Sequence, residues 1–334
     1  MKPQMNIVEP TWKSKIFLIL FSLIFVFSVT NAFAQTGKIS KNENKIPAEK
    51  LILVDAKINI SMCVSEGKVK VNGWERNEIR AFVSEGSRVG FEVRKKNEQT
   101  KTPLWVEVVG FETANNKNSG AEECLSGKEI ELDVPRNSTV DIKGSASETT
   151  INSVSRARVK YISGDIFLNN IAQGIEASTF EGDVTVENSS GAMNLTTTTG
   201  NIVAFNVNPK EIGDIFKSRT SSGAITLQQL EYGQTEANSN SGSIRFTGAV
   251  QNGGQYNFGT LNGSITLSIP QNSSGKLDAT FGYGAFDSEL PLKNVVKPNT
   301  SKTQSLTAML GSGDSTLNLK TFSGAIRIKN SNRR

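Results

Sequence analysis

Carboxylates are the side chains of this sequence that are best placed to do chemistry. The 334 residues include no histidine and only two cysteines, so the usual nucleophile–base pairs and zinc sites are not expected. Asp165 and Asp183 each follow a glycine at the start of a similar short motif. If the two motifs are adjacent rungs of a coil, their carboxylates would stack at about 4.8 Å, close to the separation used by retaining glycosidases. Aspartate is also a common turn residue, so a pair of solvated corners is the simpler interpretation.

The N-terminus has the features of an export signal. Lys13 and Lys15 precede an apolar run of 14 residues from Ile16 to Val29, and Ala32-Phe33-Ala34 then supplies a small-x-small cleavage site. A retained membrane anchor is the alternative, but a spanning helix needs about 20 apolar residues. We therefore expect cleavage after Ala34, no transmembrane segment in the mature chain, and a periplasmic or extracellular destination.

The two cysteines are expected to form a disulfide. Cys63 and Cys124 both lie in the N-terminal part of the mature chain, and an oxidising compartment favours pairing of an even number of cysteines. Two independent buried thiols are the alternative, because two cysteines carry no spacing signature.

Charge is nearly balanced along the chain. The 37 Lys and Arg against 32 Asp and Glu give a formal charge of +5, which does not indicate nucleic-acid binding. A local cluster of Lys293, Lys297 and Lys302 lies in an interruption of the repeat at residues 285–310, and a second interruption covers residues 206–218. Insertions in solenoids often carry binding, so these lysines mark a possible binding loop for acidic glycans or lipid headgroups. A solvated loop is the alternative.

A short motif recurs through the C-terminal half: glycine, a small residue, then an apolar, any, apolar triplet. Glycine can take the positive φ that a tight corner requires, and the triplet has the period of two that is typical of a strand with one buried face. The glycines of the motif are Gly164, Gly182, Gly191, Gly200, Gly223, Gly242, Gly263, Gly284, Gly313 and Gly324.

The spacing of these motifs predicts an all-β fold, a β-solenoid with rungs of about 20 residues. One such rung cannot bury enough apolar surface to stand alone, so successive rungs must stack over a shared aliphatic interior. An antiparallel sandwich is the alternative, since its strand spacing of about 8 to 12 residues also fits.

Composition then divides the chain. Charged residues become sparse after about residue 150, where Ser, Thr, Asn and Gly increase. We expect a signal peptide at 1–34, a flexible linker at 35–50, an N-terminal β cap region at 51–150, solenoid repeats at 151–329 and a polar tail at 330–334. Trp74, within the cap region, is expected in the core, with a ligand platform as the alternative.

Several segments resemble those of the bacterial exported "putative adhesin" family, β-strand-repeat domains of unknown function. They are the Gly73-Trp74-Glu75 opening, the Glu131 to Pro135 strand, the Ser163 to Ile166 repeat, the Asn262 to Pro270 segment and the closing Phe322 to Ile326. The resemblance covers roughly residues 55–329. It implies a β-solenoid with a role in adhesion or stress sensing at the cell envelope, and it supplies no catalytic residues to transfer.

The leading functional hypothesis is therefore a non-catalytic secreted or periplasmic envelope protein whose extended surface binds a glycan or protein partner. No catalytic residue, cofactor or metal is expected, and nucleic acid is not an expected partner. One alternative is a carbohydrate-active parallel β-helix enzyme using surface carboxylates such as Asp165 and Asp183. Another is an envelope-stress sensor or structural module.

Overall fold

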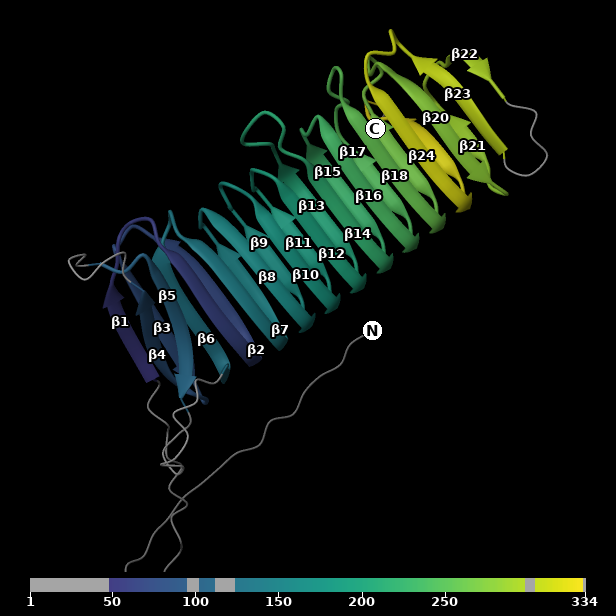
Figure 1. Ribbon diagram of the computed structural model, residues 1–334. Helices are drawn as coiled ribbons and strands as arrows, with labels where there is room; N and C mark the ends of the chain where they lie inside the picture. The colour runs from purple at the N-terminus through teal and green to yellow at the C-terminus, as the bar shows by residue number, and fades with distance from the viewer. Residues whose placement is uncertain (1–47, 95–101, 112–123, 298–303, 333–334) are drawn as a thin grey trace, which may run out of the picture. The chain divides into compact units, whose positions relative to one another are not determined.

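The computed structural model describes residues 48–94, 102–111, 124–297 and 304–332 (Figure 1). Every regular element in these ranges is a β-strand. The expected signal peptide at 1–34 lies outside the described residues, as does most of the expected linker at 35–50. The linker was predicted too long at its C-terminal end, because strand β1 begins at Ala48.

Each repeat forms one rung with a long strand, a glycine corner and a short strand. The long strands pair in parallel into one sheet, in which Ile175 of one rung lies between Ala157 and Met193 of its two neighbours. The short strands pair in parallel into a second sheet, as shown by Val184 between Ile166 and Ile202. The predicted β-solenoid is confirmed.

The spatial order of both sheets follows from these pairings. After β7 (Thr139–Asn152), the long-strand sheet contains β8 (Arg156–Ser163), β10 (Ile175–Glu181), β12 (Met193–Thr199), β14 (Phe216–Ser222), β16 (Gln234–Ser241), β18 (Gln255–Asn262), β24 (Thr316–Ser323) and β20 (Gly275–Gly282). The short-strand sheet contains β9 (Ile166–Asn169), β11 (Val184–Glu187), β13 (Ile202–Val207), β15 (Ile225–Leu230), β17 (Ile244–Thr247), β19 (Ile265–Ile269), β25 (Ile326–Asn330) and β21 (Phe286–Ser288).

The apolar pairs that follow the corner glycines point into the interior between the two sheets. Alternate residues of the short strands are almost fully buried, and parallel pairing places them in continuous columns. One column consists of Ile166, Val184, Ile202, Ile225, Ile244, Ile265 and Ile326. Two of the ten motif glycines, Gly191 and Gly313, precede long strands and do not lie at this corner.

Antiparallel strands end the stack on the N-terminal side. Strands β2 (Asn59–Trp74) and β7 are long enough to turn the corner and contribute to both sheets. Beyond β2, the long-strand sheet continues with β5 (Trp105–Phe111) and β4 (Arg88–Arg94). The short-strand sheet continues with β6 (Leu125–Pro135), β3 (Glu78–Ser84) and β1 (Ala48–Leu53).

The C-terminal rung does not lie at the end of the stack. Strand β24 lies between β18 and β20 (Figure 1), and β25 lies between β19 and β21, although β20 and β21 come earlier in the chain. The interruption at 285–310, expected as a loop, includes β22 (Lys293–Val296) and β23 (Gln304–Leu310), which pair antiparallel beyond β20. Its apolar residues Leu306, Ala308 and Leu310 are buried, because these strands cover the edge that β20 would otherwise expose.

A ladder of buried hydroxyls holds neighbouring corners together. In six successive rungs, the Thr or Ser three residues before the corner glycine donates a hydrogen bond to the carbonyl of the previous corner glycine. The pairs are Thr179–Gly164 at 3.3 Å, Thr197–Gly182 at 2.9 Å, Thr220–Gly200 at 3.0 Å, Ser239–Gly223 at 2.9 Å, Thr260–Gly242 at 2.9 Å and Thr321–Gly263 at 2.8 Å. This ladder explains why a solenoid interior contains so many hydroxyl side chains.

Removing one hydroxyl of the ladder should destabilise the stack. We expect Thr220→Val to lower the free energy of unfolding by about 2 kcal/mol, because the half-buried carbonyl of Gly200 loses its donor without a change in side-chain shape. Thr220→Ser keeps the hydroxyl and should cost less. Thr235 provides a matched control, since its Oγ1 is buried with no hydrogen-bond partner in the described structure, so Thr235→Val should be neutral or stabilising. Denaturant unfolding of the three variants would contradict the ladder if both valine substitutions had equal effects.

Candidate functional site

The carboxylates singled out in the sequence are neighbours at the glycine corners. Asp165 Oδ1 accepts a hydrogen bond of 2.8 Å from the backbone N–H of Asp183, and Asp183 Oδ1 accepts one of 2.7 Å from the N–H of Asn201. Asn201 Oδ1 in turn accepts from the N–H of Ala224 at 2.9 Å. The carboxylates therefore form part of a corner ladder, in which each side chain holds the amide of the next rung.

The other predicted site residues lie at the two ends of the stack. Cys63 of β2 and Cys124, just before β6, are joined by a disulfide with their Cα atoms 4.6 Å apart. Lys293 is exposed on β22, and Lys297 is exposed just beyond it. Lys302 lies outside the described residues.

Trp74 is half-buried at the turn between β2 and β3. Its Nε1 donates a hydrogen bond of 2.8 Å to the carbonyl of Glu78, and the Arg76 guanidinium carbon lies 5.1 Å from the centre of the indole ring. With its N–H bonded to backbone and one face covered by arginine, the indole stabilises this turn.

The outer face of the long-strand sheet holds the candidate binding surface. Because strand residues alternate between faces, every second side chain of the long strands from β8 to β20 points outward. Parallel pairing aligns these side chains in rows across the strands. The outward residues are mostly polar, and exposed apolar residues recur at the position two before the corner glycine. These are Ile162, Phe180, Leu261 and Phe322.

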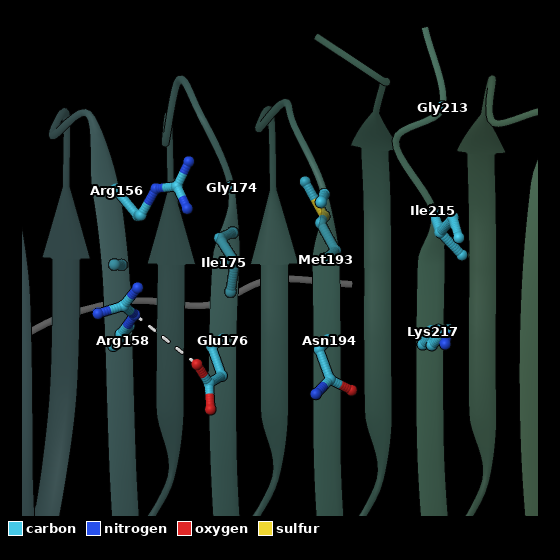
Figure 2. Close-up of a pocket in the computed structure, with 12 residues that line it drawn as sticks. Arg156, Arg158, Gly174, Ile175, Glu176, Met193, Asn194, Gly213, Ile215 and Lys217 are labelled. Atoms are coloured by element: carbon cyan, nitrogen blue, oxygen red, sulfur yellow. Dashed lines mark ion pairs between the residues drawn. The ribbon is translucent and has the colours of Figure 1, made fainter. Parts of the chain in front are cut away.

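One hollow on this face, which we call the basic groove, has a volume of about 420 Å³ and is lined by residues of β8, β10, β12 and β14 (Figure 2). Arg156, Arg158 and Lys217 contribute positive charge. Glu176 partly neutralises it, because its carboxylate lies 3.7 Å from Arg158 Nε and 3.0 Å from Lys160 Nζ.

The wall of the basic groove comes from the interruption expected at residues 206–218. Gly213 and Ile215 line the groove, and the turn before them is fixed by the Asp214 carboxylate, which accepts from two backbone N–H groups at 2.8 Å. Tyr232 packs in the interior below and donates a hydrogen bond of 2.6 Å to the carbonyl of Gly191. Burial raises the pKa of Tyr232, and the nearby Asp214 charge adds to the effect, so the phenol stays a neutral donor at physiological pH.

A second hollow of about 410 Å³, which we call the Phe322 groove, crosses β16, β18, β24 and β20. Its lining combines amide, hydroxyl, ammonium and apolar groups. The lining residues are Asn238, Ser239, Asn240, Gly259, Thr260, Leu261, Thr280, Gly282, Lys320, Thr321 and Phe322.

Sequence reasoning missed both grooves, because the motif it used begins at the corner glycine and reads only the short strand that follows. The grooves are built on the long strand that precedes each glycine. One signal of a groove was present in the sequence. Gly259 is not followed by the small, apolar, any, apolar pattern, so it does not mark a corner.

The described residues include neither a metal-binding cluster nor a membrane-spanning helix. In ranges 48–94, 102–111, 124–297 and 304–332, no group of three or more carboxylate, cysteine or histidine side chains could hold a metal ion. The same ranges contain no helix with the length and apolarity to cross a membrane.

Stacked parallel rungs, glycine corners and antiparallel end strands define the molecule as a β-solenoid. The chain belongs to the Toastrack DUF4097 family, whose profile matches residues 65–329. This confirms the resemblance to the "putative adhesin" class. A comparison with curated proteins found no match.

Solved structures similar to this chain carry related names. One is "a putative cell adhesion protein" from Clostridium sporogenes, with 14% identity over 85% of this chain and 100% of that chain, and a TM-score of 0.22. Two more are "putative adhesin" proteins from Parabacteroides distasonis (11% identity, 67% and 93% covered, TM-score 0.26) and Parabacteroides merdae (11%, 68% and 93%, TM-score 0.23).

Proposed function

We propose that this protein is a non-catalytic, adhesin-like protein of the bacterial cell envelope that presents the outer face of its long-strand sheet to a glycan or protein partner. Export is part of the proposal and rests on the signal-like segment that ends at Ala34. The observation that carries the proposal is the continuous row of outward hydrogen-bonding side chains across the long strands, which no other part of the described chain covers. It includes Glu176, Asn194, Lys217, Glu236, Asn257 and Asn318.

A catalytic role receives less support from the same geometry. Asp165 and Asp183, the carboxylate pair that could resemble a glycosidase site, accept hydrogen bonds from backbone amides of the next rung. A general acid needs a protonated carboxyl aimed at a substrate, whereas these oxygens are directed at the corner backbone. The corner arrangement favours a scaffold whose outer surface is used for binding.

The experiment compares the two outer faces of the solenoid. Beads coated with the exported protein would be tested for retention on surfaces carrying the polysaccharide fraction or the protein fraction of bacterial envelopes. We expect Asn194→Glu with Asn257→Glu, on the long-strand face, to reduce retention at least about 5-fold, because added charge and bulk in the middle of a contact surface disrupt it.

Thr185→Glu with Thr266→Glu supplies the matched control, since both threonines point outward from the short strands. Retention no greater than that of albumin-coated beads on both fractions would refute the proposal. Equal losses from the two double variants would refute the assignment to the long-strand face.

A further inference from the structure

We propose that the Phe322 groove is a binding subsite for an acidic oligosaccharide, a chain of pyranose rings in which some rings carry a carboxylate. This inference rests on the proposed binding function and goes further by naming the subsite and the class of ligand.

The groove is built from two parallel rows of outward side chains. Strand pairing aligns Asn238, Gly259, Lys320 and Thr280 in the first row. The second row lies two residues further along each strand and includes Asn240, Leu261 and Phe322. With neighbouring strands about 4.8 Å apart, the four-strand row spans about 14 Å, so the site suits an extended chain better than a single small molecule.

The second row provides an apolar and aromatic side. In this row Phe322 is 51% exposed and Leu261 is 55% exposed, and Tyr283, which lies beside the row, is 78% exposed. Tyr283 contacts Phe322 edge to face, with ring centroids 5.4 Å apart and planes at 88°, so each ring supports the orientation of the other. An exposed, supported aromatic ring offers a surface against which the C–H face of a pyranose can pack.

The first row provides hydrogen bonds. Asn238 and Thr280 offer amide and hydroxyl groups, and Asn238 is oriented by a hydrogen bond of 2.9 Å from its Nδ2 to Glu236 Oε1. Sugar hydroxyls both donate and accept, which matches amide and hydroxyl side chains. A mostly apolar partner surface would leave these polar groups desolvated without partners.

Gly259 keeps the middle of the groove open. It lies within β18 with no positive φ, so the backbone there does not require glycine, and glycine inside a strand weakens it. A Cβ at this position would stand 2.7 Å from Asn238 Oδ1, and a longer side chain would fill the space between Asn238 and Lys320. A glycine without a backbone reason fits a site where a ligand approaches closely.

Charge points to the acidic class of glycan. Lys320 is exposed, and the groove lining contains no carboxylate. Some cations elsewhere on the same face have acidic partners, such as Arg219 with Glu236 at 3.7 Å. A carboxylate on the ligand would supply the opposite charge in the groove.

Calorimetric titration of the exported protein with two probes tests the proposal. The acidic probe is an octasaccharide of alternating glucuronate and N-acetylglucosamine, and the neutral probe is the N-acetylglucosamine tetrasaccharide. We expect wild type to bind the acidic probe more tightly. Phe322→Ser should weaken its binding at least about 10-fold, and Lys320→Gln should weaken the acidic probe about 5-fold while leaving the neutral probe within about 2-fold.

Gly259→Thr is the most informative variant. The Cβ of threonine would crowd only the movable end of the Asn238 side chain, and threonine favours strands, so thermal stability should stay close to that of wild type. The threonine side chain should nevertheless block the groove and lower affinity at least about 10-fold. Phe180→Ser is the matched control, because it removes an exposed Phe from the corresponding position of β10, outside the groove, and binding should stay at the wild-type level.

Each contrary result has a distinct meaning. Absence of wild-type binding to both probes overturns the glycan ligand, while the bead assay with the protein fraction still decides the proposed function. Binding that survives Phe322→Ser and Gly259→Thr overturns the location. Equal affinity for the two probes overturns the acidic class.

Discussion

Replacing both cysteines by alanine should lower the free energy of unfolding by about 4 kcal/mol. The Cys63–Cys124 disulfide closes a separation of 61 residues, and the chain-entropy estimate for a loop of this length is about 4 kcal/mol. The loop contains β3, β4 and β5, which form much of the N-terminal end of the stack. Without the crosslink, this end must close a long loop using only its own contacts. Denaturant unfolding of the wild type and the double variant would measure the loss.

The loss should also be local. Rungs of a solenoid contact mainly their neighbours, so hydrogen exchange should quicken in β1 to β6 and stay unchanged in β12 to β18. Reduction of the wild type should reproduce the effect of the double variant, and the same reductant should not affect the variant. Two free thiols in denatured, unreduced protein would contradict the disulfide, and unchanged exchange at the N-terminal end would contradict its stabilising role.

The rung could be predicted from the sequence because its signals are local. A glycine at a corner and two apolar residues after it are fixed by backbone geometry and by burial within a few residues, as Gly182, Val184 and Val186 illustrate. The buried hydroxyl ladder was equally regular but was missed, because a threonine such as Thr220 is expected on a surface. Its partner is a backbone carbonyl of another rung, and only stacking makes that contact.

The order of the last rungs could not be predicted for a different reason. Strands β24 and β25 fit between the β18–β19 rung and the β20–β21 rung because every rung has a similar interior and corner. The spacing of the motifs therefore does not show whether the last rung is inserted into the stack or added at its end. The interruption at 285–310 was expected as a loop because Pro291 and its lysines are typical of one. Burial of Leu306 and Leu310 against β20 became evident only when that open edge was known.

The groove residues could not be predicted either, because their contacts depend on which rungs are neighbours. Phe322 and Leu261 are two residues before a corner glycine, a position that faces outward, and each is unremarkable as a single exposed apolar side chain. Strand pairing places them beside Lys320 and Gly259, although Gly259 and Phe322 are 63 positions apart in the chain. A site assembled across rungs requires the register, which one sequence does not contain.

Alanine at a corner glycine should be among the most damaging small substitutions in the chain. Gly182 has a φ of 140°, and a Cβ there would collide with the carbonyl oxygen of Gly164 in the rung below. The substitution combines backbone strain of about 1–3 kcal/mol with forced separation of two stacked corners. It would also disturb the acceptor of the Thr179 hydroxyl. We expect Gly182→Ala to lower the free energy of unfolding by at least about 3 kcal/mol.

Two other glycines separate the causes of this effect. Gly253 has a φ of 69° and open space where a Cβ would stand, so Gly253→Ala should show the cost of backbone strain alone, about 1 kcal/mol. Gly233 also has open space and no positive φ, so Gly233→Ala should change stability by less than about 0.5 kcal/mol. If denaturant unfolding gave Gly182→Ala and Gly253→Ala the same loss, close stacking of the corners would contribute nothing. The corner glycines would then be required only for the turn, and the spacing between rungs would have to be set by the side-chain columns of the interior.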